Sequence, residues 1–213
     1  MPIKENLIHQ IIDSGYLKSP RIIEAFLAID RKDFVVLEYQ NETYSNIPLP
    51  IGFGQTISQP LTVAFILELL QPQAGEKILD IGSGSGWTTA LLAYIVSQKS
   101  KKGKVIAIER IPELKEFGEK NVAKYNFINK GVVEFICADG SKGHEKEAPY
   151  DKILCSATVS EVPKDWLKQL KKGGRIVTPF NGEVQLWIKK AENEFDIKRF
   201  QGFTFVPLII DKE

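Results

Sequence analysis

The sequence predicts an α/β fold, a doubly wound parallel sheet with N-terminal helices before it and a C-terminal antiparallel hairpin after it. Between residues 77 and 179, short apolar runs typical of buried strands alternate with segments of helical periodicity. The first of these runs ends in a glycine-rich turn at residues 82–86, and a helix is expected to follow from Trp87. At 213 residues the chain is long enough for one α/β domain.

Two helices are expected ahead of the sheet. In the segment 3–13 apolar residues recur at helical spacing, and a second helix is expected to begin at Pro20 because proline suits the first helical turn. The following segment, residues 37–59, has few regular signals and many turn formers. A loop of this length is usually functional.

A third helix, over residues 60–70, leads into the sheet, with Ser58 or Gln59 as its expected cap. Strands and helices then alternate. The expected order is strand 77–82, helix 86–98, strand 104–109, helix 112–126, strand 132–137, strand 151–156, helix 163–170 and strand 174–179. The last third of the chain indicates a hairpin formed by residues 184–190 and 197–207.

The spacing of the glycines separates the nucleotide-binding classes. A dinucleotide fingerprint, G-x-G-x-x-G, that started at Gly82 would need a glycine at position 87, where the chain has Trp87. A phosphate loop is also absent from the sequence, because the Gly-Lys-Ser/Thr motif is missing and no lysine lies between Lys77 and Lys99. These observations weigh against hydride transfer and against nucleoside triphosphate chemistry.

The next predicted strand ends in an acidic residue, Glu109, 23 residues after Gly86. A carboxylate at that place can accept hydrogen bonds from both hydroxyls of a ribose. Because no pyrophosphate site accompanies it, S-adenosylmethionine is the ligand that fits best. A plain strand-to-helix corner is the alternative interpretation of the glycine turn alone.

Composition excludes several function classes. The net charge is +1, with 28 basic and 27 acidic residues, so no overall field attracts nucleic acid or an anionic membrane. The apolar runs are far shorter than the ~20 residues of a membrane span, and residues 1–6 do not resemble a signal peptide. We therefore expect a cytoplasmic protein that binds neither nucleic acid nor membrane, with monomer as the default state.

Metal binding and nucleophilic catalysis are not indicated either. Cys137 and Cys155 lie in predicted strands without metal-ligand spacing, which predicts two reduced, buried thiols and no metal site. The two histidines, His9 and His144, have no cysteine or serine partner that the sequence identifies. Methyl transfer to a carboxylate would need no such pair, because a carboxyl group of pKa ~4 is already ionised at neutral pH.

Several segments of the sequence resemble the motifs of a known family. The segment 47–60, IPLPIGFGQTISQP, closely resembles the signature PLPIGxGQTISxP of the protein-L-isoaspartate O-methyltransferase family. The likeness covers about residues 20–210 and continues in the segments 80–87, 108–114, 138–141, 148–151, 170–174 and 205–208. It implies a Rossmann-like class I methyltransferase sheet and an enzyme that uses S-adenosylmethionine to esterify the free α-carboxylate of isoaspartyl residues in proteins or peptides. The ester can then collapse to a succinimide and reopen partly as normal aspartate.

The resemblance also implies roles for single residues. Ser58 would be the catalytic hydroxyl beside the substrate carboxylate, with Thr56 and Ile57 shaping the pocket and Val206 offering an edge to the substrate backbone. The implied cofactor-binding residues are Gly82, Ser83, Gly84 and Gly86 along the methionine part, Asp80 behind that loop or at the amino group, Glu109 at the ribose, and Asp139 with Gly140 at the adenine edge.

One segment departs from the family pattern and leaves the acceptor open. Where the family usually has a loop of the TAAxPxIP kind, residues 156–163 are SATVSEVP, without the first proline. Proline fixes its own φ and restricts the residue before it, so its absence is expected to loosen or reshape the wall that faces the peptide. The alternatives are therefore a sister methyltransferase for another peptide carboxylate and a catalytically silent cofactor-binding module.

We expect a single domain over residues 1–213. Its parts are the N-terminal helices with the substrate loop (1–59), the cofactor-binding core (60–180) and the C-terminal hairpin (181–213).

Overall fold

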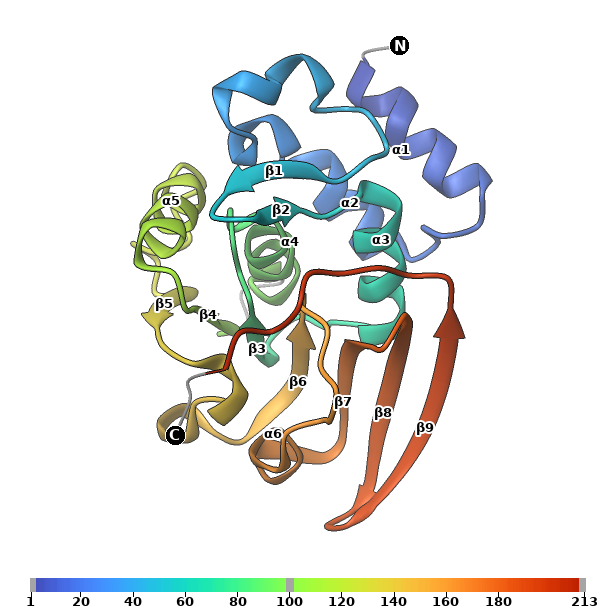
Figure 1. The fold of residues 1–213 in the computed structure, drawn as a ribbon, viewed down its shortest axis with the longest axis vertical. Helices are drawn as coiled ribbons and strands as arrows, with labels where there is room; N and C mark the ends of the chain where they lie inside the picture. The colour runs from blue at the N-terminus through green and yellow to red at the C-terminus, as the bar shows by residue number, and fades with distance from the viewer. Residues whose placement is uncertain (1–2, 99–101, 211–213) are drawn as a thin grey trace.

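The computed structural model describes residues 3–98 and 102–210 and contains a seven-stranded sheet with the strand order β5-β4-β3-β6-β7-β8-β9 (Figure 1). The strands are β3 (Lys77–Ile81), β4 (Lys104–Glu109), β5 (Val133–Cys137), β6 (Tyr150–Cys155), β7 (Leu170–Phe180), β8 (Glu183–Ala191) and β9 (Glu194–Gln201). The five strands β3, β4, β5, β6 and β7 pair in parallel with their neighbours, whereas β8 pairs antiparallel with both β7 and β9. The predicted doubly wound sheet and its C-terminal hairpin are confirmed.

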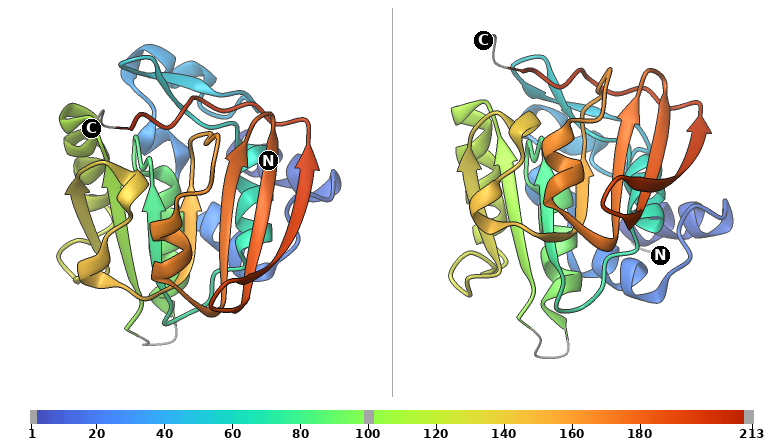
Figure 2. Two further views of the ribbon diagram at one scale, coloured as in Figure 1. Left: turned by 60° about the horizontal axis from the view of Figure 1, so that its bottom comes forward. Right: turned by 90° about the horizontal axis from the view of Figure 1, so that it is seen from below.

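Helices cover both faces of the sheet (Figure 2). They are α1 (Ile3–Asp13), α2 (Pro20–Ala28), α3 (Pro60–Leu70), α4 (Trp87–Val96), α5 (Pro112–Ala123) and α6 (Lys164–Gln169). Helices α3, α4 and α5 pack on one face, α6 packs against β7 on the other, and α1 and α2 form an outer layer over α3 and α4. The N-terminal helices and the helix over residues 60–70 are thus confirmed.

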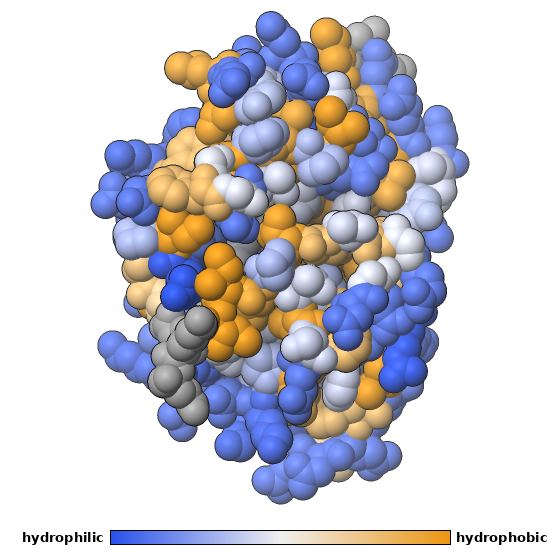
Figure 3. Space-filling model, viewed as in Figure 1, coloured by the Kyte–Doolittle hydropathy of each residue, from blue (hydrophilic) through white to orange (hydrophobic). Residues whose placement is uncertain are grey.

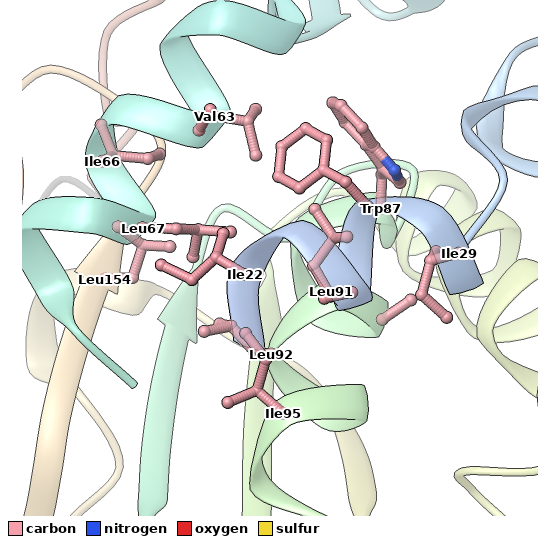
Figure 4. Close-up of a cluster of buried hydrophobic side chains, with 14 of the residues drawn as sticks. Ile22, Ile29, Val63, Ile66, Leu67, Trp87, Leu91, Leu92, Ile95 and Leu154 are labelled. Atoms are coloured by element: carbon pink, nitrogen blue, oxygen red, sulfur yellow. The ribbon is translucent and has the colours of Figure 1, made fainter. Parts of the chain in front are cut away.

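The larger of two hydrophobic cores joins the N-terminal helices to the glycine-loop helix. Ile22 of α2, Leu67 of α3 and Leu91 of α4 meet there with no side-chain exposure (Figure 4). Trp87, the first residue of α4, packs edge-to-face against Phe26 of α2 at 5.6 Å between ring centroids. The N-terminal layer therefore fixes the start of α4, the helix that follows the glycine loop.

The segment 37–59, predicted as an irregular loop, contains a short hairpin. Its strands are β1 (Leu49–Gly52) and β2 (Gln55–Ile57), which pair antiparallel after a 3-10 turn, η2 (Leu37–Glu42). The strands are only four and three residues long and β1 contains a proline, so the sequence carries little strand periodicity. The turn between them includes Phe53, which adopts φ +53°.

The last predicted strand, residues 197–207, ends earlier than expected. Strand β9 stops at Gln201, and residues 202–210 run as an extended tail across the carboxyl ends of the parallel strands (Figure 1). Thr158 holds this tail, because its N–H donates to the Val206 carbonyl and its own carbonyl accepts from Leu208, both at 2.8 Å. Hydrophobic side chains interrupt the polar surface on the face that the tail crosses (Figure 3).

The prediction of two buried thiols is half wrong. Cys155 is buried in the central strand β6, where burial raises the pKa of its thiol to about 12. Cys137 is exposed, because it ends β5 at the edge of the sheet, where only one neighbouring strand covers it. Within residues 3–98 and 102–210 no three potential metal ligands cluster, and no helix is long and apolar enough to cross a membrane.

Candidate active site

The strand order reverses between β3 and β6, and a cleft opens at that point. The chain runs outward from β3 through β4 to β5, and then returns to place β6 on the other side of β3. In such sheets ligands bind outside the carboxyl ends of the strands at this reversal. The loops after β3, β4, β5 and β6 line this cleft, and the β1–β2 hairpin and residues 206–209 border it. We call it the switch-point cleft.

The glycine loop between β3 and α4 forms one wall of this cleft. Gly82, Gly84 and Gly86 have φ values of +72°, +51° and +86°, a region that other residues rarely adopt. A Cβ on Gly86 would lie 2.8 Å from the carbonyl oxygen of Gly118 in α5, and a Cβ on Gly118 would lie 2.6 Å from that of Gly84. The loop and α5 therefore touch backbone to backbone.

Glu109, at the end of β4, binds this loop and also faces the cleft. Its Oε2 accepts a hydrogen bond from the Gly84 N–H at 2.9 Å, and its Oε1 accepts one from the Ile111 N–H at 3.0 Å. The side chain is largely buried but lines the cleft. Each carboxylate oxygen can accept more than one hydrogen bond, so both oxygens keep capacity for a ligand hydroxyl.

Asp80 lies behind the glycine loop rather than in the cleft lining. Its Oδ2 accepts a hydrogen bond from the Thr89 hydroxyl at 2.6 Å, while its buried Oδ1 has no partner. Burial raises the pKa of Asp80 to about 7; the Thr89 hydrogen bond opposes this rise and the negative charge of Glu109 adds to it. Of the two roles expected for Asp80, this position favours support of the loop.

Of the other residues expected to bind the cofactor, two line the cleft and one lies outside its lining. Ser83 lines the cleft with a buried hydroxyl that has no partner. Gly140 lines it too, at a place where a Cβ would lie 2.4 Å from Ile81 Cγ2. Asp139 is outside the lining, and its carboxylate accepts a hydrogen bond from the Ser141 N–H at 2.8 Å, which shapes the turn after β5.

A second cleft joins the first at the family-like segment. It lies between α3, the β1–β2 hairpin and residues 201–206, and it shares with the switch-point cleft the residues Thr56, Ser58, Ser156 and Val206. Of the expected substrate residues, Ile57 lines only the switch-point cleft, where its side chain is buried. The junction thus brings together three of the four residues predicted for catalysis and substrate binding.

Ser58 does not cap the following helix. The residue in the cap position of α3 is Gln59, and the Leu61 N–H in the first turn is bound instead by the Asn46 side chain at 3.0 Å. Within the described part of the chain the Ser58 hydroxyl makes no hydrogen bond, and the residue is partly exposed where the clefts meet. The hydroxyl is therefore available to a ligand.

Comparison with known proteins assigns the family. The model of the protein-L-isoaspartate(D-aspartate) O-methyltransferase family matches residues 2–213. The chain belongs to this family. It is 41% identical over 210 residues to the protein-L-isoaspartate O-methyltransferase of Methanopyrus kandleri, covering 97% of this chain and 91% of the relative. It is 42% identical to that of Staphylothermus marinus, covering 96% and 95%.

Two solved structures superpose on this chain over nearly its full length. A protein-L-isoaspartate O-methyltransferase superposes with a TM-score of 0.83 at 29% identity, over 96% of this chain and 65% of that longer chain. A putative protein-L-isoaspartate O-methyltransferase from Plasmodium falciparum, solved in complex with S-adenosyl-L-homocysteine, gives a TM-score of 0.86 at 24% identity and covers 97% and 98%. The fold is that of a class I methyltransferase.

In this isoaspartate methyltransferase family member, the loop that carries Ser58 is held by a residue that the sequence did not single out. The buried guanidinium of Arg31 donates to four backbone carbonyls, those of Thr43 (2.6 Å), Ser45 (3.2 Å), Ile47 (2.9 Å) and Ser58 (3.2 Å). It also lies 5.4 Å from the centre of the Trp87 ring. Burial lowers the pKa of Arg31 to about 10, so it stays charged at neutral pH.

The segment that departs from the family pattern is firmly held. Besides the two bonds between Thr158 and the tail, the Val159 N–H donates to the Pro179 carbonyl at 3.1 Å. Ser156, just before them, lines both clefts. These three bonds tie the segment 158–159 to the tail and to β7.

Gly118 is a second residue that sequence reasoning missed. It lies in the middle of α5, against the glycine loop, and the available signal was a glycine within a helical pattern. Three residues later, the buried Asn121 side chain donates to the Ser85 carbonyl at 3.1 Å. One face of α5 therefore supports the loop from outside the cleft.

Proposed function

We propose that this protein transfers a methyl group from S-adenosylmethionine to the free α-carboxylate of L-isoaspartyl residues in damaged proteins and peptides, which starts repair through a succinimide. The observation that carries the proposal is the junction of the two clefts at Ser58. One cleft has the glycine loop and the carboxylate expected of a nucleoside site, and the other adjoins it at Ser58 and has no charged residue in its lining. Family membership supplies the acceptor class.

The residues of the switch-point cleft fit the cofactor. The glycine loop offers bare backbone, and Ser83 offers a buried hydroxyl without a partner. We assign Gly82, Gly84 and Gly86 to the methionine part, Glu109 to the ribose and Gly140 to the adenine edge, with Asp80 and Asp139 supporting the loops from behind. When bound, the sulfonium supplies an electrophilic methyl group together with its own leaving group.

The chain's part in the reaction is to place the acceptor. An isoaspartyl carboxyl group of pKa ~4 is ionised at neutral pH, so no general base is required. The Ser58 hydroxyl can donate to one carboxylate oxygen, a charge-assisted bond of about 1.5–3 kcal/mol. Neither histidine of the chain lines either cleft, which agrees with catalysis by orientation.

The remaining substrate-binding residues are assigned from their positions at the junction of the two clefts or beside it. We assign Thr56 and Val206 to the walls around the acceptor carboxylate and Ile57 to the floor beneath it. We further propose a cytoplasmic monomer that binds no nucleic acid, in agreement with the net charge of +1. The division into residues 1–59, 60–180 and 181–213 stays a working description of one domain.

The proposal is tested with labelled S-adenosylmethionine and two peptides that differ only in one residue, isoaspartate or aspartate. We expect base-labile label on the isoaspartyl peptide alone. Label on both peptides to the same extent would indicate a sister methyltransferase for another carboxylate. Cofactor binding in a calorimeter without label on either peptide would indicate a silent binding module.

A further inference from the structure

The second cleft extends beyond the junction at Ser58 and is lined without charge. Its walls come from Tyr16, from residues 48–62, from Ser156 and from residues 201–206. None of the lining residues is Asp, Glu, Lys, Arg or His, although such residues make up about a quarter of the chain. An ionised side chain placed there would lose hydration without gaining an ion-pair partner.

Aromatic rings contribute to the lining of this cleft. Tyr16, from the turn between α1 and α2, is 38% exposed, and it meets Phe65 edge-to-face at 5.7 Å between centroids. Phe203 of the tail stacks on Phe65 at 4.7 Å, with 5° between the ring planes, and Phe200 packs on Phe65 from the side at 5.3 Å. We call Tyr16 and Phe203, which line the cleft, the aromatic wall. Phe65 and Phe200 hold it from behind.

We propose that the aromatic wall is a side-chain subsite of the acceptor cleft, which binds an aromatic or branched aliphatic residue of the substrate peptide close to the isoaspartyl residue. This inference rests on the proposed function. The occupant is a side chain of the substrate, because the aromatic wall lines the same cleft as Thr56 and Ser58, the residues assigned to the acceptor carboxylate. The uncharged lining favours an apolar side chain over an acidic or basic one.

The test uses isoaspartyl peptides in a glycine background. Phenylalanine, aspartate or glycine is placed one, two or three positions from the isoaspartyl residue, on either side. At one of these positions we expect phenylalanine to raise kcat/KM over glycine by roughly 5- to 10-fold, mainly through KM, as partial burial of a ring predicts. Aspartate at that position lowers kcat/KM below the glycine value.

Variants connect the preference to the aromatic wall. Tyr16→Ala is expected to bring the ratio of kcat/KM for the phenylalanine and glycine peptides to within about twofold of one, because the ring that supplies the contact is gone. Tyr16→Phe keeps the ring and is expected to keep the preference. Leu37→Ala is the matched control, because Leu37 is 90% exposed and lines neither cleft.

The outcomes distinguish a failure of the subsite proposal from a failure of the proposed methylation of isoaspartate. Equal kcat/KM for the phenylalanine, aspartate and glycine peptides at every position would overturn the subsite and leave the methylation of isoaspartate intact. Methylation of none of the peptides would overturn the proposed function itself. A preference that persists in a Tyr16→Ala protein with an unchanged melting temperature would place the subsite elsewhere and contradict the assignment to this wall.

Discussion

Replacing Arg31 tests whether the loop that carries Ser58 is held in place by one buried cation. Arg31→Met keeps the aliphatic stem and removes four hydrogen bonds to carbonyls. At about 1.5–3 kcal/mol for a bond to a charged group, the gross loss is about 6–12 kcal/mol. Removing the guanidinium also removes its burial penalty of several kcal/mol, and the exposed residues Ser45 and Ile47 can rehydrate their carbonyls. We therefore expect a net loss of roughly 2–4 kcal/mol in the free energy of unfolding.

The same substitution should slow catalysis more than it weakens cofactor binding. The Ser58 carbonyl loses its anchor, and a misplacement of about 1 Å at a reacting group can cost 10²-fold in rate. Urea unfolding gives the stability, initial rates give kcat, and calorimetry gives the cofactor Kd. Arg31→Lys, which keeps the charge but not the planar fork, should fall between wild type and Arg31→Met. An Arg31→Met protein within 0.5 kcal/mol of wild type and with unchanged kcat would refute the reasoning, because surface substitutions without a structural role show changes of about that size.

Four further substitutions test separate parts of the site. Ser58→Ala should lower kcat roughly 10- to 150-fold, the equivalent of one charge-assisted bond, with little change in cofactor Kd; an unchanged rate would remove the hydroxyl from the transfer step. Glu109→Ala should weaken cofactor binding in a calorimeter, and a Kd within about twofold of wild type would make the ribose assignment wrong. Gly118→Ala places a methyl group 2.6 Å from the Gly84 carbonyl oxygen, so the melting temperature should fall by an amount equivalent to about 1–3 kcal/mol; a wild-type melting curve would contradict the contact. Burial raises the pKa of Asp80 to about 7 in the folded state, above its value in the unfolded chain, so its contribution to stability is present below pH ~4 and is lost as the pH rises through ~7. Asp80→Asn should flatten that part of the stability profile, and an equally steep profile would assign the slope to other groups.

The parts of the site that the sequence predicted are those with local signals. The buried strand, predicted over 77–82 and found over 77–81, and the glycines after it are recognisable in one short stretch, since strand burial and positive φ leave a local pattern. The structure confirms the strand and places Glu109 in contact with the same loop, because parallel strands bring their carboxyl ends to one edge.

The parts that the sequence did not predict depend on contacts between distant segments. Arg31 lies 27 residues before Ser58, whose carbonyl it binds, and Gly118 closes on the glycine loop from a different helix. The predicted strand 197–207 ends at Gln201, and of the apolar residues that follow, Phe203, Phe205 and Val206 line clefts instead of joining the sheet. Periodicity reports whether a residue is buried, and it does not report which partner buries it.

Conversion of an isoaspartyl peptide into its aspartyl isomer tests the central claim most directly. The peptide is incubated with the protein and S-adenosylmethionine, the ester is allowed to close to the succinimide and reopen, and the two isomers are separated by chromatography. We expect the aspartyl isomer to accumulate only when both protein and S-adenosylmethionine are present, and to accumulate more slowly with Ser58→Ala. An isoaspartyl peptide that stays unconverted while the protein demonstrably binds S-adenosylmethionine would contradict the account.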